Sequence, residues 1–142
     1  QQKAKYTIQN KPQVLLVEDN HVNQIVATTI LQKLNCQVTT ASNGQEALEK
    51  ISRNEFAIVL MDCHMPVMDG YEATRLIRQQ SSLRDLPVIA VTANVLDGDK
   101  EKCFACGMND YLNKPYERNL LAEKLAKWLA SRSSTSQHSA SL

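Results

Sequence analysis

Short runs of wholly apolar residues alternate along this chain with longer stretches in which apolar residues recur at helical spacing. The clearest runs are residues 14–17, 56–61 and 86–91, and none of them contains a charged side chain. A strand that is apolar at every position must be covered on both faces, as in a parallel sheet flanked by helices. The alternation therefore predicts an α/β domain built from five successive strand–helix units.

The boundaries of these units follow from the apolar pattern and from turn residues. The predicted strands are residues 14–17, 36–41, 56–61, 86–91 and 110–113, and the predicted helices are residues 22–34, 45–52, 71–78, 96–106 and 117–130. Asn20 is expected to cap the first helix, and Gly107 is expected to end the fourth. The expected buried face of the first helix comprises Val22, Ile25, Val26, Thr29, Ile30 and Leu34.

Length and composition suit one domain. A chain of 142 residues with 43% hydrophobic residues can bury one sizeable core. We assign residues 12–130 to this domain, residues 1–11 to a polar linker and residues 131–142 to a Ser-rich disordered tail. A formal net charge of +1 argues against a polyanionic partner. No stretch approaches the roughly 20 apolar residues of a membrane helix, so a cytoplasmic location is expected.

The chain contains four cysteines, which are Cys36, Cys63, Cys103 and Cys106. So few cysteines do not indicate a disulfide framework in a chain of this size. The spacing of Cys103 and Cys106 also occurs in redox pairs and in half of a zinc site, but no second pair and no nearby His completes such a site. We therefore expect reduced cysteines that pack as buried or half-buried residues.

Polar, reactive side chains follow four of the five predicted strands. Glu18 and Asp19 follow the first strand, Asp62 the third, Thr92 the fourth and Lys114 the fifth. In an open parallel sheet the functional crevice lies beyond the carboxyl ends of the strands, where the strand order reverses. In a doubly wound sheet of order 2-1-3-4-5, the first and third strands are neighbours. This order would place three carboxylates together, beside a hydroxyl and an ammonium group.

Such a set of groups suits phosphoryl transfer. Carboxylates about 4 Å apart repel one another by several kcal/mol near a protein surface, and Mg²⁺ could both relieve this repulsion and bridge to a phosphoryl oxygen. Asp62 is then a candidate nucleophile that carries the phosphoryl group as a mixed anhydride. Lys114 and Thr92 would bind phosphoryl oxygens. Alternatively, each polar residue could merely end a strand. This explanation is reasonable for any one of these residues but not for all five together.

The segments around these residues resemble the receiver domain of two-component response regulators, over residues 12–129. The matching segments are VEDN at 17–20, MDCHMPVMDG at 61–70, VTAN at 91–94 and YLNKP at 111–115. The resemblance implies a flavodoxin-like (βα)5 fold. It also implies that Asp62 takes a phosphoryl group from a phosphohistidine in a Mg²⁺-dependent reaction, and that the domain catalyses this step and its own slow dephosphorylation.

The same resemblance implies the residues of the metal site. Glu18 and Asp19 would be the acidic pair that binds Mg²⁺, together with the acceptor Asp62. His64 would contribute its backbone carbonyl. The side chain of His64 stands where related receivers more often carry Gln or Asn, so it is open whether that side chain is an exposed loop residue, a residue that tunes the lifetime of the phosphorylated state, or a metal ligand.

A conformational switch is also implied by the resemblance. Phosphorylation would draw the Thr92 hydroxyl toward the phosphoryl group and let Tyr111 turn inward, which would alter the face built from the fourth helix, the fifth strand and the fifth helix. His64 and Asn94 would flank the phosphoryl group and set its lifetime. The bond between Lys114 and Pro115 would be cis.

Within this family, Asn20, Asn23 and residues 69–74 look most like the receivers of hybrid sensor histidine kinases. That likeness implies two partners, a histidine kinase dimerisation domain and a histidine phosphotransfer protein, and a full-length protein that could be tethered to a membrane. Val22, Ile25 and Met65 are candidate contacts for the phosphotransfer protein, unless they belong to the core. Nucleic acid and direct membrane contact are not expected, and the isolated domain is expected to be a monomer.

Four other functions remain as alternatives. The chain could be a stand-alone response regulator that acts by protein binding, or a degenerate receiver that only binds, although its acid pair, acceptor and lysine are intact. A phosphohydrolase with an aspartyl-phosphate intermediate would carry a second Asp where this chain has His64. A nucleotide or flavin binder would need a Gly-rich phosphate loop, which the sequence lacks.

Overall fold

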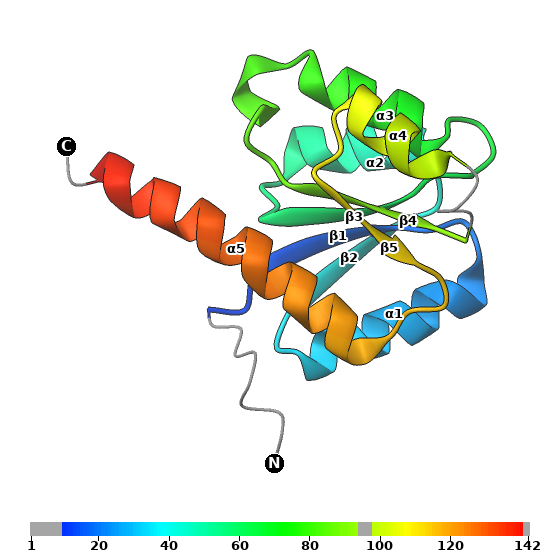
Figure 1. Ribbon diagram of the computed structural model, residues 1–142, viewed down its shortest axis with the longest axis horizontal. Coiled ribbons are helices and arrows are strands. Elements are labelled where there is room, and N and C mark those ends of the chain that lie inside the picture. The colour runs from blue at the N-terminus through cyan, green and yellow to red at the C-terminus, as the bar shows by residue number, and fades with distance from the viewer. Residues whose placement is uncertain (1–9, 94–97, 141–142) are drawn as a thin grey trace.

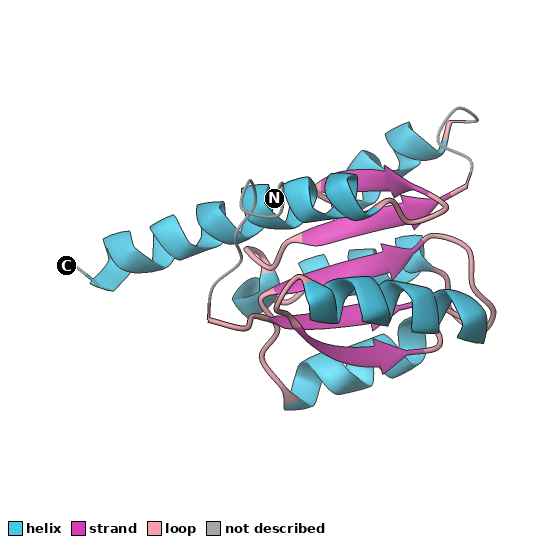
Figure 2. Cartoon of the chain, turned by 90° about the horizontal axis from the view of Figure 1, so that it is seen from below, coloured by secondary structure: helices cyan, strands magenta, loops and turns pink. Residues whose placement is uncertain are grey.

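The computed structural model describes residues 10–93 and 98–140 of the chain. Its sheet contains five parallel strands in the order β2-β1-β3-β4-β5 (Figure 1). The strands are β1 (Gln13–Val17), β2 (Gln37–Ala41), β3 (Ile58–Asp62), β4 (Val88–Thr92) and β5 (Asp110–Asn113). All five arrows point the same way in Figure 2. The predicted α/β fold and strand order are therefore confirmed.

Helices cover both faces of the sheet. They are α1 (His21–Lys33), α2 (Gly44–Arg53), α3 (Gly70–Arg78), α4 (Asp99–Cys106) and α5 (Arg118–Ala140), and a short 3-10 helix, η2 (Ser81–Leu83), precedes β4. Figure 1 shows α1 and α5 against one face of the sheet and α2, α3 and α4 against the other. Each crossover returns the chain to the same edge of the sheet, so all the loops that follow strands lie at one edge.

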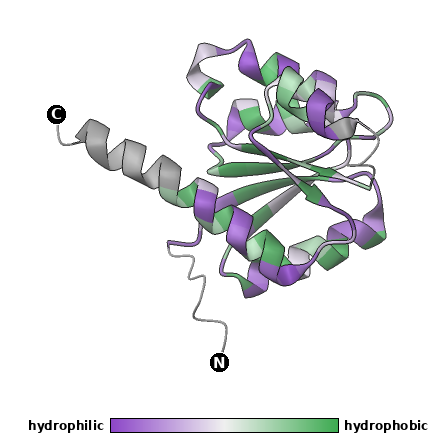
Figure 3. Ribbon diagram, viewed as in Figure 1, coloured by the Kyte–Doolittle hydropathy of each residue, from purple (hydrophilic) through white to green (hydrophobic). Residues whose placement is uncertain are grey.

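Two apolar cores form, one on each face of the sheet. Along β1, Leu15 and Val17 pack toward α2 and α3, whereas Val14 and Leu16 pack toward α1 and α5. All four side chains are fully buried. Figure 3 shows the resulting pattern, with hydrophobic strands between helices whose outer surfaces are largely hydrophilic. Burial on both faces explains why the strands are apolar at every position.

The predicted buried face of α1 is wrong in part. Val22, Ile25 and Val26 are 66%, 54% and 44% exposed, and Thr29 is exposed as well, whereas Ala27 and Leu31 are fully buried. Apolar residues occur around most of this helix, so their spacing alone does not select one face. The side of α1 that carries the small residue Ala27 packs against the sheet.

The capping predictions are confirmed. Asn20 Oδ1 accepts a hydrogen bond of 2.9 Å from the Asn23 N–H at the start of α1. Gly107 ends α4 in the left-handed conformation, with φ at +109°. The Lys114–Pro115 bond is cis, as the family resemblance implied.

Helix α5 extends ten residues beyond its predicted end at Ala130 and reaches Ala140. No Gly or Pro occurs after Pro115 to stop a helix, and Ser disfavours a helix interior only mildly. The predicted start of the fourth helix at residue 96 and the candidate residue Asn94 lie outside the described residues. The assignment of residues 1–11 to a linker and of residues 131–142 to a tail remains a prediction.

All four cysteines are reduced and buried, as expected. Burial raises the pKa of the Cys36 thiol to about 11, so this thiol is un-ionised at neutral pH. Among the described helices, none is both long and apolar enough to cross a membrane.

Candidate functional site

Three carboxylates lie together at the edge of the sheet where the strands end. Glu18 follows β1 directly, Asp19 is next in the chain, and Asp62 is the last residue of the neighbouring strand β3. One carboxylate oxygen from each lies within 4.8 Å of the others. Glu18 and Asp62 are buried at 0% and 2% exposure, whereas Asp19 is exposed. The predicted acidic cluster is therefore formed.

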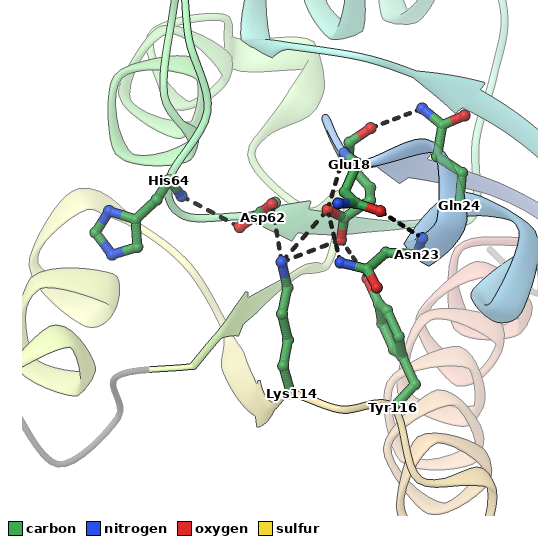
Figure 4. A network of polar contacts seen from close by, with 8 residues as sticks. Glu18, Asn23, Gln24, Asp62, His64, Lys114 and Tyr116 are labelled. Carbon is green, nitrogen blue, oxygen red and sulfur yellow. Dashed lines mark hydrogen bonds and ion pairs between the residues drawn. The ribbon is translucent and has the colours of Figure 1, made fainter.

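Lys114 joins this cluster from the end of β5. Its Nζ lies 3.1 Å from Asp62 Oδ2 and 3.3 Å from each carboxylate oxygen of Glu18 (Figure 4). Residues that are 52 and 96 positions away in the chain are thus bridged by one ammonium group. Because an ammonium group at a buried carboxylate offsets part of its desolvation cost, this arrangement holds both acids in place.

Glu18 also accepts hydrogen bonds from groups to which the sequence analysis gave no role in the acid cluster. The Asn20 N–H and Asn23 Nδ2 donate to its Oε2 over 3.2 and 3.4 Å, and the Tyr116 hydroxyl donates to its Oε1 over 3.1 Å. Burial and the charge of Glu18 raise the pKa of Tyr116, so the phenol stays protonated and can donate. The position of Tyr116, two residues after Lys114, is the only sequence signal that places it at this edge.

The surroundings of Asp62 raise its pKa above the ordinary value of an aspartate. Burial and the nearby charge of Glu18 raise the pKa of Asp62 to about 6, although Lys114 and the His64 N–H act in the opposite direction. Burial lowers the pKa of Lys114, but the charges of Asp62 and Glu18 raise it by more, so it is raised overall. The described site thus places three acidic side chains beside one ammonium group, so acidic groups are in excess.

This donor set fits a hard divalent cation. All three side chains offer oxygen ligands, which Mg²⁺ prefers, and their oxygens are close enough together to share one ion. The excess of acidic groups favours a divalent cation, and the exposure of Asp19 leaves the cluster open to solvent on that side. Glu18, Asp19 and Asp62 are thus able to hold Mg²⁺.

His64 contacts the acceptor candidate through its backbone. Its N–H donates to Asp62 Oδ1 over 3.2 Å, and in Figure 4 its imidazole points away from Asp62. The exposed ring lies edge-on to Tyr71, with the ring centroids 5.8 Å apart. The sequence left three roles open for this side chain: exposed loop residue, lifetime-tuning residue and metal ligand. The geometry agrees with an exposed loop residue at the edge of the site.

Thr92 and Tyr111 lie on the strands nearest to Lys114. Thr92 is the last residue of β4 and is 1% exposed, and it pairs in register with Asn113, next to Lys114. The half-buried ring of Tyr111 lies edge-on to Phe104, with Lys100 and Lys124 Nζ atoms 5.3 and 5.1 Å from its centroid. Thr92 is therefore at the same edge as the carboxylates, and Tyr111 is on the outer face between α4 and α5.

Gly70 allows α3 to begin directly beneath the acceptor candidate. Its N–H donates to the Cys63 carbonyl over 3.1 Å, and a Cβ atom at this position would lie 2.2 Å from the Asp62 carbonyl oxygen. No side chain fits at that distance, so the close approach of α3 to the end of β3 requires glycine here. Asp69, just before it, caps α3 by accepting from the Glu72 N–H.

Comparison with known proteins independently supports the resemblance to receiver domains. A family model described as "Response regulator receiver domain" matches residues 14–126. Hybrid signal transduction histidine kinase M of Dictyostelium discoideum is 44% identical over 119 residues, and sensor histidine kinase GacS of Pseudomonas protegens is 39% identical over 120 residues. These matches cover 80% and 82% of this chain but only 5% and 13% of the two kinases.

Solved structures of receiver domains agree with the fold. One is the receiver domain of sensor histidine kinase PA1611 from Pseudomonas aeruginosa, which has a magnesium ion coordinated in its active-site cleft. It is 47% identical to this chain with a TM-score of 0.80, and the match covers 84% of this chain and 98% of that one. The receiver domain of Ssk1 from Saccharomyces cerevisiae, solved with the histidine phosphotransfer protein Ypd1, is 32% identical with a TM-score of 0.80, over 86% and 91% of the two chains.

Proposed function

The chain belongs to the response regulator receiver domain family, and from this membership we propose that Asp62 accepts a phosphoryl group from a phosphohistidine in a Mg²⁺-dependent reaction. The observation that carries the proposal is the position of Asp62, buried at the end of β3 between two further carboxylates and the Lys114 ammonium. In the transfer, an Asp62 oxygen forms a bond to phosphorus while the bond between phosphorus and the histidine nitrogen breaks. The electron pair of that bond stays on the imidazole.

The residues around Asp62 have distinct tasks in this step. The His64 N–H holds one Asp62 oxygen and Lys114 holds the other, which fixes the carboxylate in the orientation needed for attack. Lys114 and the Thr92 hydroxyl then bind oxygens of the transferred group. Glu18, Asp19, Asp62 and the His64 carbonyl would hold Mg²⁺, which neutralises the charge on the phosphoryl oxygens when it is bound.

Thr92 and Tyr111 are the proposed switch. Thr92 is buried at the end of β4 next to Lys114, and Tyr111 lies on the adjacent strand β5 between α4 and α5, where the proposed change would reach the outer face. We assign His64 and Asn94 to tuning the lifetime of the phosphorylated state. For His64 this rests on its place two residues after Asp62, where its N–H binds Asp62 Oδ1 and its side chain is exposed.

The proposed partners are a histidine kinase dimerisation domain and a histidine phosphotransfer protein. Val22, Ile25 and Val26 form an exposed apolar patch on α1, which begins two residues after Asp19. Such a patch beside the acid cluster suits a helical partner that must bring its histidine to Asp62. Met65 is a weaker candidate contact, because it is partly buried against the core.

The two relatives are histidine kinases, one of them a hybrid kinase, and this supports a place for this chain within a longer, cytoplasmic or membrane-tethered kinase. Kinase activity would then belong to other parts of that protein. The domain itself catalyses only its own phosphorylation and slow dephosphorylation, and in isolation it is proposed to be a monomer.

The test is intact mass spectrometry after incubation with acetyl phosphate, with and without Mg²⁺. The expected result is a gain of one phosphoryl group that requires Mg²⁺ and is absent from Asp62→Asn. If a folded wild-type chain gains no phosphoryl group from acetyl phosphate or from a phosphorylated phosphotransfer protein, then the domain acts only by binding.

A further inference from the structure

Tyr116 connects the start of α5 to the acid cluster. Its hydroxyl donates to Glu18 Oε1 over 3.1 Å, across 98 positions of the chain. Its ring packs against the core between the sheet and the helices α1 and α5, beside residues such as Leu121. The ring is therefore held on both sides, and the hydroxyl points at the acids, as Figure 4 shows.

Glu18 needs such donors because it is fully buried. Its Oε2 accepts from the Asn20 N–H, from Asn23 and from Lys114, whereas its Oε1 accepts from Tyr116 and Lys114. Without the phenol, Lys114 is the single described donor to Oε1, and it also has to bind Asp62. A buried carboxylate oxygen that loses its donor is costly, so Glu18 and Lys114 would move closer together.

We propose that Tyr116 is a positioning residue for Mg²⁺, which fixes the carboxylate of Glu18 in the orientation that the ion requires and leaves Lys114 available to Asp62. This inference rests on the proposed function and adds a residue to it. Partners that hydrogen-bond a metal ligand commonly change metal affinity by about 10- to 100-fold when they are removed. Tyr116 contacts neither the acceptor nor the transferred group in this arrangement, so its effect is on metal binding and not on the transfer itself.

The experiment measures Mg²⁺ binding to the whole chain by isothermal titration calorimetry for wild type, Tyr116→Phe and a matched control, Trp128→Phe. The control also removes one donor from α5 to a buried carboxylate, because Trp128 Nε1 donates to Asp110 Oδ2 over 2.9 Å. Tyr116→Phe is expected to raise the Mg²⁺ dissociation constant about 10-fold, while Trp128→Phe changes it less than about twofold. Asn23→Ala, which removes a longer contact of 3.4 Å, is expected to give a smaller increase than Tyr116→Phe.

A second readout separates positioning from general damage. At saturating Mg²⁺, the rate of phosphorylation of Tyr116→Phe by acetyl phosphate is expected to return to within about twofold of wild type, whereas at low Mg²⁺ it stays about 10-fold below. Circular dichroism during urea unfolding gives the stability of each variant.

Equal dissociation constants for Tyr116→Phe and wild type would overturn the positioning role and leave the proposed function intact. Equal weakening in Tyr116→Phe and Trp128→Phe would also overturn it, because loss of α5 packing would then explain the change. If Tyr116→Phe did not fold, an unchanged constant in Asn23→Ala would count against positioning of Glu18 by its neutral donors. A wild-type chain that bound no Mg²⁺ would overturn both proposals.

Discussion

Lys114 Nζ lies 3.1 Å from Asp62 Oδ2. The ammonium that is proposed to bind the incoming phosphoryl group thus already stabilises the carboxylate that receives it. Because Glu18 contacts the same ammonium, one side chain balances the charge of two buried acids.

Lys114→Met should therefore weaken both the fold and the reaction. Loss of the one cation that the described residues place at this site would leave two buried carboxylates uncompensated. We expect this to lower the free energy of unfolding by about 3 kcal/mol in urea without Mg²⁺. Phosphorylation by acetyl phosphate should slow by about 100-fold or more, since a charge that stabilises the transition state is lost. Lys127→Met is the matched control, because the Lys127 side chain is 65% exposed, and it should change neither quantity appreciably.

Asp62→Asn should stabilise the metal-free protein at high pH. The pKa of Asp62 is raised to about 6 in the folded chain, whereas an Asp in an unfolded chain titrates near about 4. Folding therefore becomes less favourable as the pH rises from about 4 to about 6, and the full cost is present above that range. Asn cannot ionise, so the variant should be about 2 kcal/mol more stable than wild type at pH 8.

This stability difference should shrink as the pH falls and vanish below about pH 4, where Asp62 is protonated in both states. Urea unfolding in EDTA at several pH values measures it. A difference of the same size at pH 4 and pH 8 would show that the gain has a cause other than the ionisation of Asp62.

Gly70→Ala should distort the acceptor strand. An added Cβ would meet the Asp62 carbonyl oxygen at 2.2 Å, so α3 or the end of β3 must shift, at a cost of about 2–3 kcal/mol in unfolding free energy. Gly98→Ala is the control variant, because no atom lies within 4 Å of a Cβ added there and only its φ of +88° disfavours alanine. This strain should lower the free energy of unfolding by about 1 kcal/mol. Only Gly70→Ala should also slow phosphorylation; equal rates in the two variants would contradict this account.

Ile25→Asp should separate partner-dependent from partner-independent phosphorylation. Ile25 is 54% exposed on α1, so a charge there should spare the fold but disrupt an apolar contact, reducing transfer from a phosphotransfer protein about 10-fold. Phosphorylation by acetyl phosphate should be unchanged. Gln32→Asp places the same charge on the same helix at another exposed position, and an equal loss of transfer in that variant would argue against the α1 patch.

The strands could be predicted because a segment that is buried on both faces carries apolar residues at nearly every position. The bounds of β5 match the prediction. The meeting of Glu18, Asp62 and Lys114 could be predicted because strand order decides which loops are adjacent. The buried side of α1 could not, since apolar residues occur on most of its circumference. Tyr116 could not, because its role depends on the direction of a side chain that leaves an irregular loop.

The site draws on both ends of the domain, since Glu18 and Lys114 are 96 positions apart. During synthesis the acids leave the ribosome long before the lysine and Tyr116 do. Until the last strand has joined the sheet, a nascent chain therefore has an acceptor carboxylate but no ammonium to orient it. The complete set of groups around Asp62 therefore forms only when the last strand joins the sheet, late in synthesis.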